Sequence, residues 1–69
     1  MTLDEFAEKL KAIGPGKYSG VPYENYAELF PPGEPDKLAR ERCEKFARSH
    51  GFRIENQPDI QQVWFIKDA

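Results

Sequence analysis

Cys43 and His50 are the residues whose types could support nucleophilic catalysis, because a reactive thiolate needs a base beside it. They lie seven positions apart on one predicted helix. That spacing is about two turns, or ~10 Å along the axis, which is too far for a direct hydrogen bond. We therefore interpret Cys43 as a small buried residue and His50 as a residue stabilised near a helix C-terminus. We predict that the protein is not an enzyme.

Metal and cofactor chemistry have little support in the sequence. One cysteine and one histidine cannot form a four-ligand zinc site, and the single cysteine cannot form an internal disulfide. The segment Gly14-Pro15-Gly16 does not follow a predicted strand and matches no phosphate-binding loop. We predict no catalytic residues, no metal and no cofactor.

Length and composition favour one small domain. The chain has 69 residues, of which 39% are hydrophobic, so it is too rich in core material for a disordered protein. It is short enough to form a single compact domain over residues 1–69. No apolar run approaches the ~18–20 residues that span a bilayer, and the N-terminus lacks the pattern of a signal peptide. We expect a cytoplasmic protein with no membrane contact.

Two long helices are expected, over residues 1–13 and 36–50. Thr2 and Glu5 fit a capping box at the start of the first, and Asp36 is a suitable N-cap for the second. Gly14 and Gly51 are suited to ending them. The apolar residues of each helix recur at helical spacing, which places them on one face: Leu3, Phe6, Ala7, Leu10 and Ile13, then Ala39, Cys43, Phe46, Ala47 and His50.

The segment between these helices predicts shorter elements. Residues 17–21 are consistent with an extended segment. A short helix is expected over 22–30, with Pro22 at its first position, because the aromatic and apolar residues after it follow helical spacing. Residues 31–35, which include three prolines, are expected to form an ordered loop.

The C-terminal residues predict a β-hairpin, with strands over 52–55 and 61–67 and turn chemistry over 56–60. The second strand does not alternate, because Val63 and Phe65 point one way and Trp64 and Ile66 the other. Both of its faces therefore need cover. Either this strand is central in a three-stranded sheet, or helices cover one face and aromatic side chains the other. The fold class is α+β, with two main helices, a short helix and a C-terminal antiparallel hairpin within a small sheet.

Positive charge gathers in the middle of an acidic chain. The whole sequence has 12 acidic and 10 basic residues, a net charge of -2. Residues 34–53 carry six cations against four acids, so that segment is basic while both flanks are acidic. Five of these cations are candidate phosphate contacts for single-stranded RNA or DNA: Lys37, Arg40, Lys45, Arg48 and Arg53. If they are exposed, Tyr18, Tyr23 or Trp64 could stack bases.

The same stretch resembles a known family. Phe30-Pro31-Pro32 precedes the second long helix, Arg40 lies on it, Ala47 and Gly51 mark its end, and the hairpin closes on Lys67. This pattern is similar to the R-three-H domain, named for its Arg-x-x-x-His motif and associated with binding single-stranded nucleic acids. The resemblance implies a helix at 3–13 and a nucleic-acid partner.

The chain departs from that family at two places. Glu44 stands four residues after Arg40, where the family has its histidine. Gln61-Gln62 begin the last strand, where the family tends to carry arginine. Both departures remove potential phosphate contacts, and Glu44 adds a carboxylate that repels phosphate. Arg40 and Glu44 also have the spacing of an intrahelical ion pair.

Two other interpretations stay open. Three helices followed by a hairpin is also the outline of a winged-helix domain, with 36–50 as recognition helix and 56–61 as wing tip. That wing is acidic and has no lysine or arginine for phosphate contacts. Alternatively, the chain is a protein-interaction or regulatory module that contacts a protein partner through its aromatic segment 18–26 or the hairpin edge. In that case the charges of 36–50 only solvate a surface helix.

Overall fold

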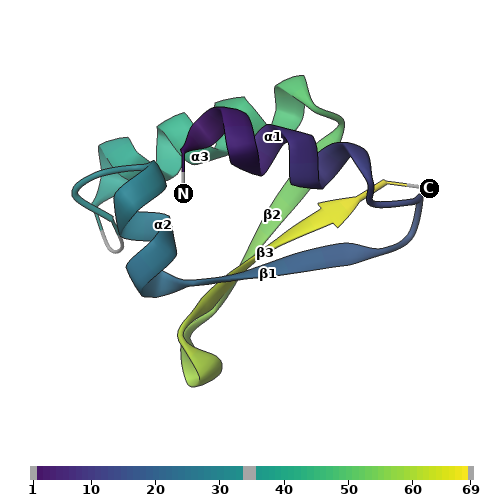
Figure 1. Cartoon of the computed structure of the whole chain (residues 1–69). Coiled ribbons are helices and arrows are strands. Elements are labelled where there is room, and N and C mark those ends of the chain that lie inside the picture. Colours follow the sequence, from purple (N-terminus) through teal and green to yellow (C-terminus); the bar gives the residue numbers. More distant parts are fainter. Residues whose placement is uncertain (1, 34–35, 69) are drawn as a thin grey trace.

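The computed structural model describes residues 2–33 and 36–68 and is of the α+β class. Its elements follow one another as helix, strand, helix, helix, strand and strand, with a short 3₁₀ turn between the last two strands (Figure 1). In chain order they are α1 (Leu3–Lys11), β1 (Tyr18–Pro22), α2 (Tyr23–Leu29), α3 (Lys37–Ser49), β2 (Phe52–Gln57), the 3₁₀ turn Pro58–Ile60 and β3 (Gln62–Lys67).

The two long helices begin where their capping residues predict. The Glu5 amide donates to Thr2 Oγ1 over 3.2 Å, and the Thr2 amide donates to Glu5 Oε1 over 3.1 Å, which completes the capping box. At α3, the Ala39 amide donates to Asp36 Oδ1 over 2.9 Å. The first helix ends at Lys11 rather than residue 13, and Ile13 packs against the core from the turn that follows.

The extended segment and short helix are confirmed as β1 and α2, with a shift at their junction. Pro22 is the last residue of β1 and the N-cap of α2, not the first helical residue. The loop after α2 is described as far as Gly33. Its predicted continuation at residues 34 and 35 lies outside the described residues.

The sheet has the strand order β1-β3-β2, and both pairings are antiparallel. The last strand is therefore central, which was one of the two arrangements that its unbroken apolar run predicted. Val63 and Phe65 are buried under the helices, and Trp64 and Ile66 lie half-buried on the other face. Because β1 supplies the third strand, the hairpin is not an isolated ribbon.

The predicted turn of the hairpin was too long. Asn56 and Gln57 belong to β2, where they pair with Val63 and Gln62. The reversal occupies Pro58–Ile60 and Gln61, whose φ of 52° is left-handed. Asparagine and glutamine beside a proline suggested turn chemistry, but cross-strand pairing keeps both residues extended.

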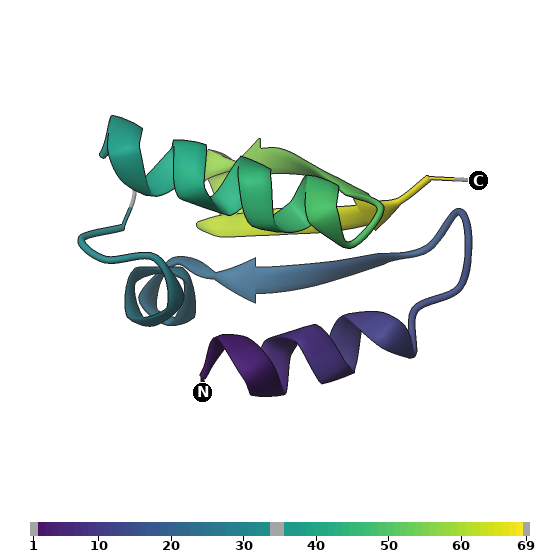
Figure 2. The same cartoon turned by 90° about the horizontal axis from the view of Figure 1, so that it is seen from above.

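The helices lie on one side of the sheet. α1 and α3 run along the same face, and α2 lies at the end of the sheet where β1 stops (Figures 1 and 2). No described helix crosses the opposite face, which we call the open sheet face. Its side chains come from alternate positions of the three strands: Tyr18, Gly20, Pro22, Arg53, Glu55, Gln57, Gln62, Trp64 and Ile66.

Aromatic rings fill the core between the helices and the sheet. The Phe65 ring packs edge-on against Phe6 of α1, with ring centroids 4.8 Å apart. Phe46 of α3 lies 6.0 Å from Phe6 and 5.7 Å from Phe30, again between centroids. These contacts join both long helices to the central strand, so the orientation of α3 depends on this cluster.

Candidate nucleic-acid interface

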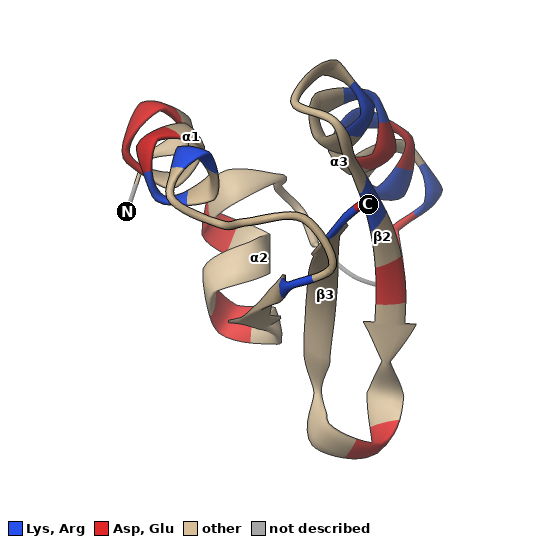
Figure 3. Cartoon of the chain, turned by 90° about the vertical axis from the view of Figure 1, so that its right-hand side faces the viewer, with Lys and Arg blue, Asp and Glu red and all other residues tan. Residues whose placement is uncertain are grey.

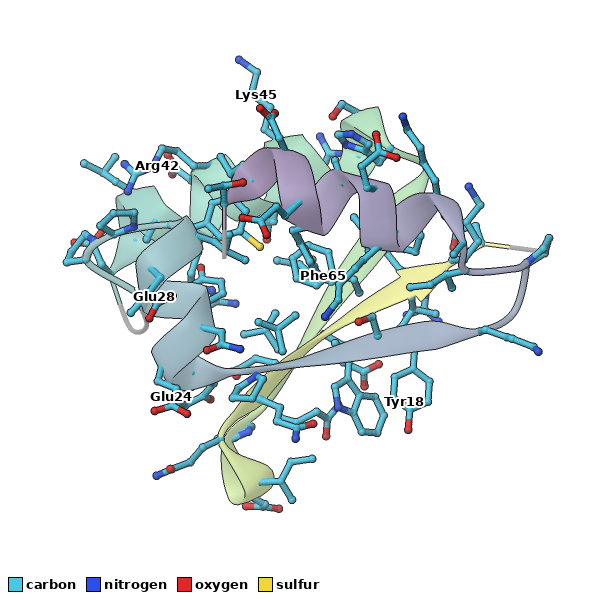
Figure 4. The ribbon with its side chains drawn as sticks, in the orientation of Figure 1. Tyr18, Glu24, Glu28, Arg42, Lys45 and Phe65 are labelled. Carbon is cyan, nitrogen blue, oxygen red and sulfur yellow. The ribbon has the colours of Figure 1, made fainter. Side chains whose placement is uncertain are left out.

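The predicted site residues of α3 divide between two sides of the helix. Lys37 and Arg40 line a hollow of about 280 Å³ together with Glu41 and Glu44. Lys45 does not line this hollow, and its side chain points away from the sheet (Figure 4). The helix geometry explains the difference, because Ala39, Cys43 and Ala47 face the core and turn Lys45 to the outside.

A second hollow adjoins the first at Glu44 and reaches β2. Arg48 and Arg53 line a space of about 290 Å³ with Glu44, and the apolar wall of this space is Phe52 and Ile54. Glu44 borders both hollows, so they adjoin along α3 and β2, and we call the two together the α3–β2 groove. Four of the five predicted cations therefore line one groove.

Charges of both signs alternate along this side of the molecule (Figure 3). The four cations of the α3–β2 groove lie beside three carboxylates, those of Glu41, Glu44 and Asp68. Arg53 Nε lies 3.5 Å from Asp68 Oδ1, and its Nη1 lies 3.9 Å from Glu55 Oε2. These side chains are more than half exposed, so the pairs are weak and open to competition from another anion.

Arg42 has a structural contact on the opposite flank of α3. Its guanidinium donates to the carbonyl oxygen of Pro31, in the loop that follows α2. The segment before α3 is thereby joined to the helix itself. Arg42 was not among the predicted site residues, and this contact directs it away from the groove.

The open sheet face holds an exposed aromatic pair. The rings of Tyr18 and Trp64 stack with centroids 4.4 Å apart and an interplanar angle of 28°. Tyr18 is 54% exposed and points away from the helices, whereas Phe65 points into the core (Figure 4). The Trp64 indole N–H donates to Gln62 Oε1 over 3.1 Å, which fixes the ring on this face.

Gly20 lies beside the indole ring and its hydrogen-bond acceptor. It lies opposite Trp64 in the β1–β3 pairing. A Cβ at this position would approach Gln62 Oε1 to 2.7 Å and the Trp64 ring to 3.4 Å. The ring contact would be ordinary, so a Cβ here would mainly displace the Gln62 side chain that accepts the indole N–H. No feature of the isolated sequence links Gly20 with Trp64, because the contact exists only in this strand register.

The other predicted stacking residue has a different role. The Tyr23 hydroxyl donates to Asn56 Oδ1, which joins the start of α2 to β2. Tyr26, in the same aromatic segment, is fully buried. Among Tyr18, Tyr23 and Trp64, the structure therefore brings Tyr18 and Trp64 together and leaves Tyr23 apart.

The residues considered for catalysis lie at the core and at the end of α3. Cys43 is 0% exposed. His50 Nδ1 lies 2.9 Å from the carbonyl oxygen of Phe46, and the imidazole packs on the Phe46 ring. Lys67, one of the residues that carry the family resemblance, donates to the carbonyl oxygen of His50 over 3.5 Å and lies over the Phe52 ring.

Comparison with known proteins gives no family. No family model, no curated protein and no solved structure matches this chain. Within residues 2–33 and 36–68, no cluster of three or more histidine, cysteine or acidic side chains could hold a metal ion. No helix in that part of the chain has the length and apolar character to span a bilayer.

Proposed function

We propose that the chain is a small non-enzymatic module that binds single-stranded RNA or DNA through the phosphates. The observation that carries the proposal is the α3–β2 groove, where four exposed cations line two adjoining hollows. The groove contains four cations against three carboxylates, whereas the whole chain has a net charge of -2. Its local charge therefore suits a polyanion better than the total suggests.

Binding in this groove depends on displacement of weak internal partners. Phosphate oxygens would replace Asp68 and Glu55 at the Arg53 guanidinium, where the present distances are 3.5 and 3.9 Å. Exposed ion pairs contribute about 0–1 kcal/mol each, so their loss costs little. The remaining carboxylates oppose the strand, which limits the affinity. Because the cation–phosphate contacts join exposed charges, the affinity also falls as salt is added. The resemblance to the R-three-H domain supports the same partner.

The cations of the groove are expected to act independently of base sequence. Each of the variants Lys37→Ala, Arg40→Ala and Arg48→Ala should weaken binding by about two- to fivefold and lower the salt slope by about 0.7. Lys45→Ala is the matched control, because it removes the same charge from the same helix but outside the groove. Fluorescence anisotropy of a labelled 12-nucleotide oligothymidylate, measured from low to moderate salt, gives both quantities.

Two outcomes would refute the proposal. One is an unchanged anisotropy at low salt and high protein concentration. The other is a Lys45→Ala variant that loses as much affinity as Arg48→Ala. Circular dichroism of each variant checks that the fold is intact, as expected for exposed side chains.

Removal of the Glu44 carboxylate should strengthen binding. Glu44 borders both hollows of the groove, so Glu44→Gln leaves four cations against two carboxylates there. One unfavourable charge near a phosphate is worth about 1 kcal/mol, which corresponds to about fivefold in affinity. Glu8→Gln removes an exposed carboxylate of α1, which is not part of the groove, and should leave the affinity unchanged. Equal affinities of wild type and Glu44→Gln would place the strand elsewhere.

A protein partner is the second candidate, and the alternation of charge in the groove favours it. Paired acids and bases on one surface suit an equally mixed protein surface. β2 is also an edge strand, so its outer side could accept another strand. Sedimentation of the protein with and without oligonucleotide separates the two candidates. A protein-binding module would show no oligonucleotide complex at any salt concentration.

A further inference from the structure

The stacked Tyr18–Trp64 pair lies outside the core, on the open sheet face. Most of its large aromatic side chains fill the core, yet Tyr18 is 54% exposed. The pair is held in place rather than left loose. The indole lies opposite Gly20, Gln62 accepts its N–H, and the two rings stack at 4.4 Å. The open sheet face thus presents a fixed, flat aromatic surface to solvent.

Arg53 connects this surface to the α3–β2 groove. It lies opposite Ile66 in the β2–β3 pairing, and Ile66 lies opposite Tyr18 in the β1–β3 pairing. The three residues therefore form one row across the open sheet face. With two interstrand spacings between them, the backbones of Arg53 and Tyr18 are about 10 Å apart. Arg53 also lines the groove beside Arg48, so one end of this row belongs to the groove and the other to the aromatic pair.

We infer that the Tyr18–Trp64 pair is a base-stacking platform for the strand whose phosphates lie in the α3–β2 groove. This inference rests on the function proposed above and specifies how the bases are held. The strand passes Arg53, crosses the row at Ile66 and places an unpaired base on the exposed face of the aromatic pair. Every base has a π-face, so stacking of this kind tolerates any sequence.

The nature of the partner follows from the surface. A base inside a duplex is already stacked on both sides, so a platform of this kind selects single strands over duplexes. The Arg53 guanidinium at the end of the row supplies the positive charge that the next phosphate needs. A second copy of the chain, or an apolar protein surface, could cover the same rings. Neither would pair with the cations of the α3–β2 groove, which begins at Arg53.

The single tryptophan of the chain makes the platform directly observable. A 12-nucleotide oligothymidylate should quench Trp64 fluorescence, because a base stacks on or beside the indole. An abasic sugar-phosphate oligomer of the same length should bind more weakly and leave the fluorescence unchanged. A duplex of the same length should also fail to quench it.

Variants of Tyr18 separate the platform from the phosphate contacts. Tyr18→Ala should lower the affinity for the oligothymidylate by between about fivefold and 100-fold, with no change for the abasic oligomer. Tyr18→Phe keeps the ring and should stay within about twofold of wild type. Tyr23→Phe is the control away from the open sheet face, because that hydroxyl bonds to Asn56.

The outcomes distinguish the two proposals. Equal affinity for the oligothymidylate and the abasic oligomer, with constant fluorescence, would overturn the platform and leave the phosphate groove standing. Quenching with full affinity in the Lys37→Ala, Arg40→Ala and Arg48→Ala triple variant would support the platform and overturn the groove. No binding of either oligomer would overturn both. Fluorescence that changes with protein concentration alone would assign the face to a second copy and overturn the platform.

Discussion

Replacement of Phe65 by alanine is expected to remove a large part of the free energy of unfolding at 25 °C. Phe65 is 0% exposed, lies on the central strand and packs edge-on against Phe6. Truncation of a buried phenylalanine costs about 3–5 kcal/mol. A chain of this length has a free energy of unfolding of about 3–10 kcal/mol in total. The variant would therefore lose a large part, or all, of its stability.

Urea denaturation followed by circular dichroism measures this loss. Phe65→Leu keeps most of the apolar volume and should retain a cooperative transition at a lower urea midpoint. Tyr18→Ala is the matched control on the same sheet, because it removes an aromatic ring from the exposed face and should cost less than about 1 kcal/mol. A Phe65→Ala protein with a transition near that of wild type would contradict this account of the core.

Replacement of Gly33 by alanine is the second large expected effect, with a loss of about 2–5 kcal/mol. Gly33 has a φ of +98°, which costs a residue with a Cβ about 1–2 kcal/mol. The new Cβ would also lie 2.8 Å from the Cβ and 3.1 Å from the Cα of Ala27 on α2. Relief of that clash requires the loop and α2 to separate, at a cost of about 1–3 kcal/mol.

Gly16 provides the control that separates these two causes. Its φ is +80°, but a Cβ there would meet nothing within 4 Å. Gly16→Ala should therefore cost only the backbone part, about 1–2 kcal/mol. In the Gly33→Ala background, Ala27→Gly should recover part of the loss, because it removes one of the two clashing carbons. Equal urea midpoints for Gly16→Ala and Gly33→Ala would show that the contact with Ala27 is unimportant.

The helices were predictable because their signals are local. Thr2 and Asp36 each cap an amide three residues away, so the interacting groups lie within one turn of sequence. The strands were harder, because Asn56 and Gln57 carry turn-like side chains and are held in β2 by partners on β3. Only the strand register decides whether these two residues form a turn or extend β2.

Part of the candidate site was likewise predictable from local sequence, and part depends on tertiary packing. That α3 is basic follows from the sequence, and its helical spacing separates Lys45 from the core side. Which flank of α3 meets β2 follows from the packing of Phe46 against Phe6 and Phe30, which is a long-range arrangement. The roles of three similar tyrosines also depend on tertiary contacts. Tyr26 is buried, Tyr23 bonds to Asn56 and Tyr18 faces solvent.

The position of β3 affects how the protein can form during its synthesis. In the described chain, β1 and β2 each pair with β3 and not with each other. A nascent chain that has reached residue 61 therefore contains both edge strands but no sheet. The backbone of Tyr18 can pair only once Ile66, its partner far along the sequence, has been synthesised. The edges of β1 and β2 that face β3 can therefore pair only after residues 62–67 have left the ribosome.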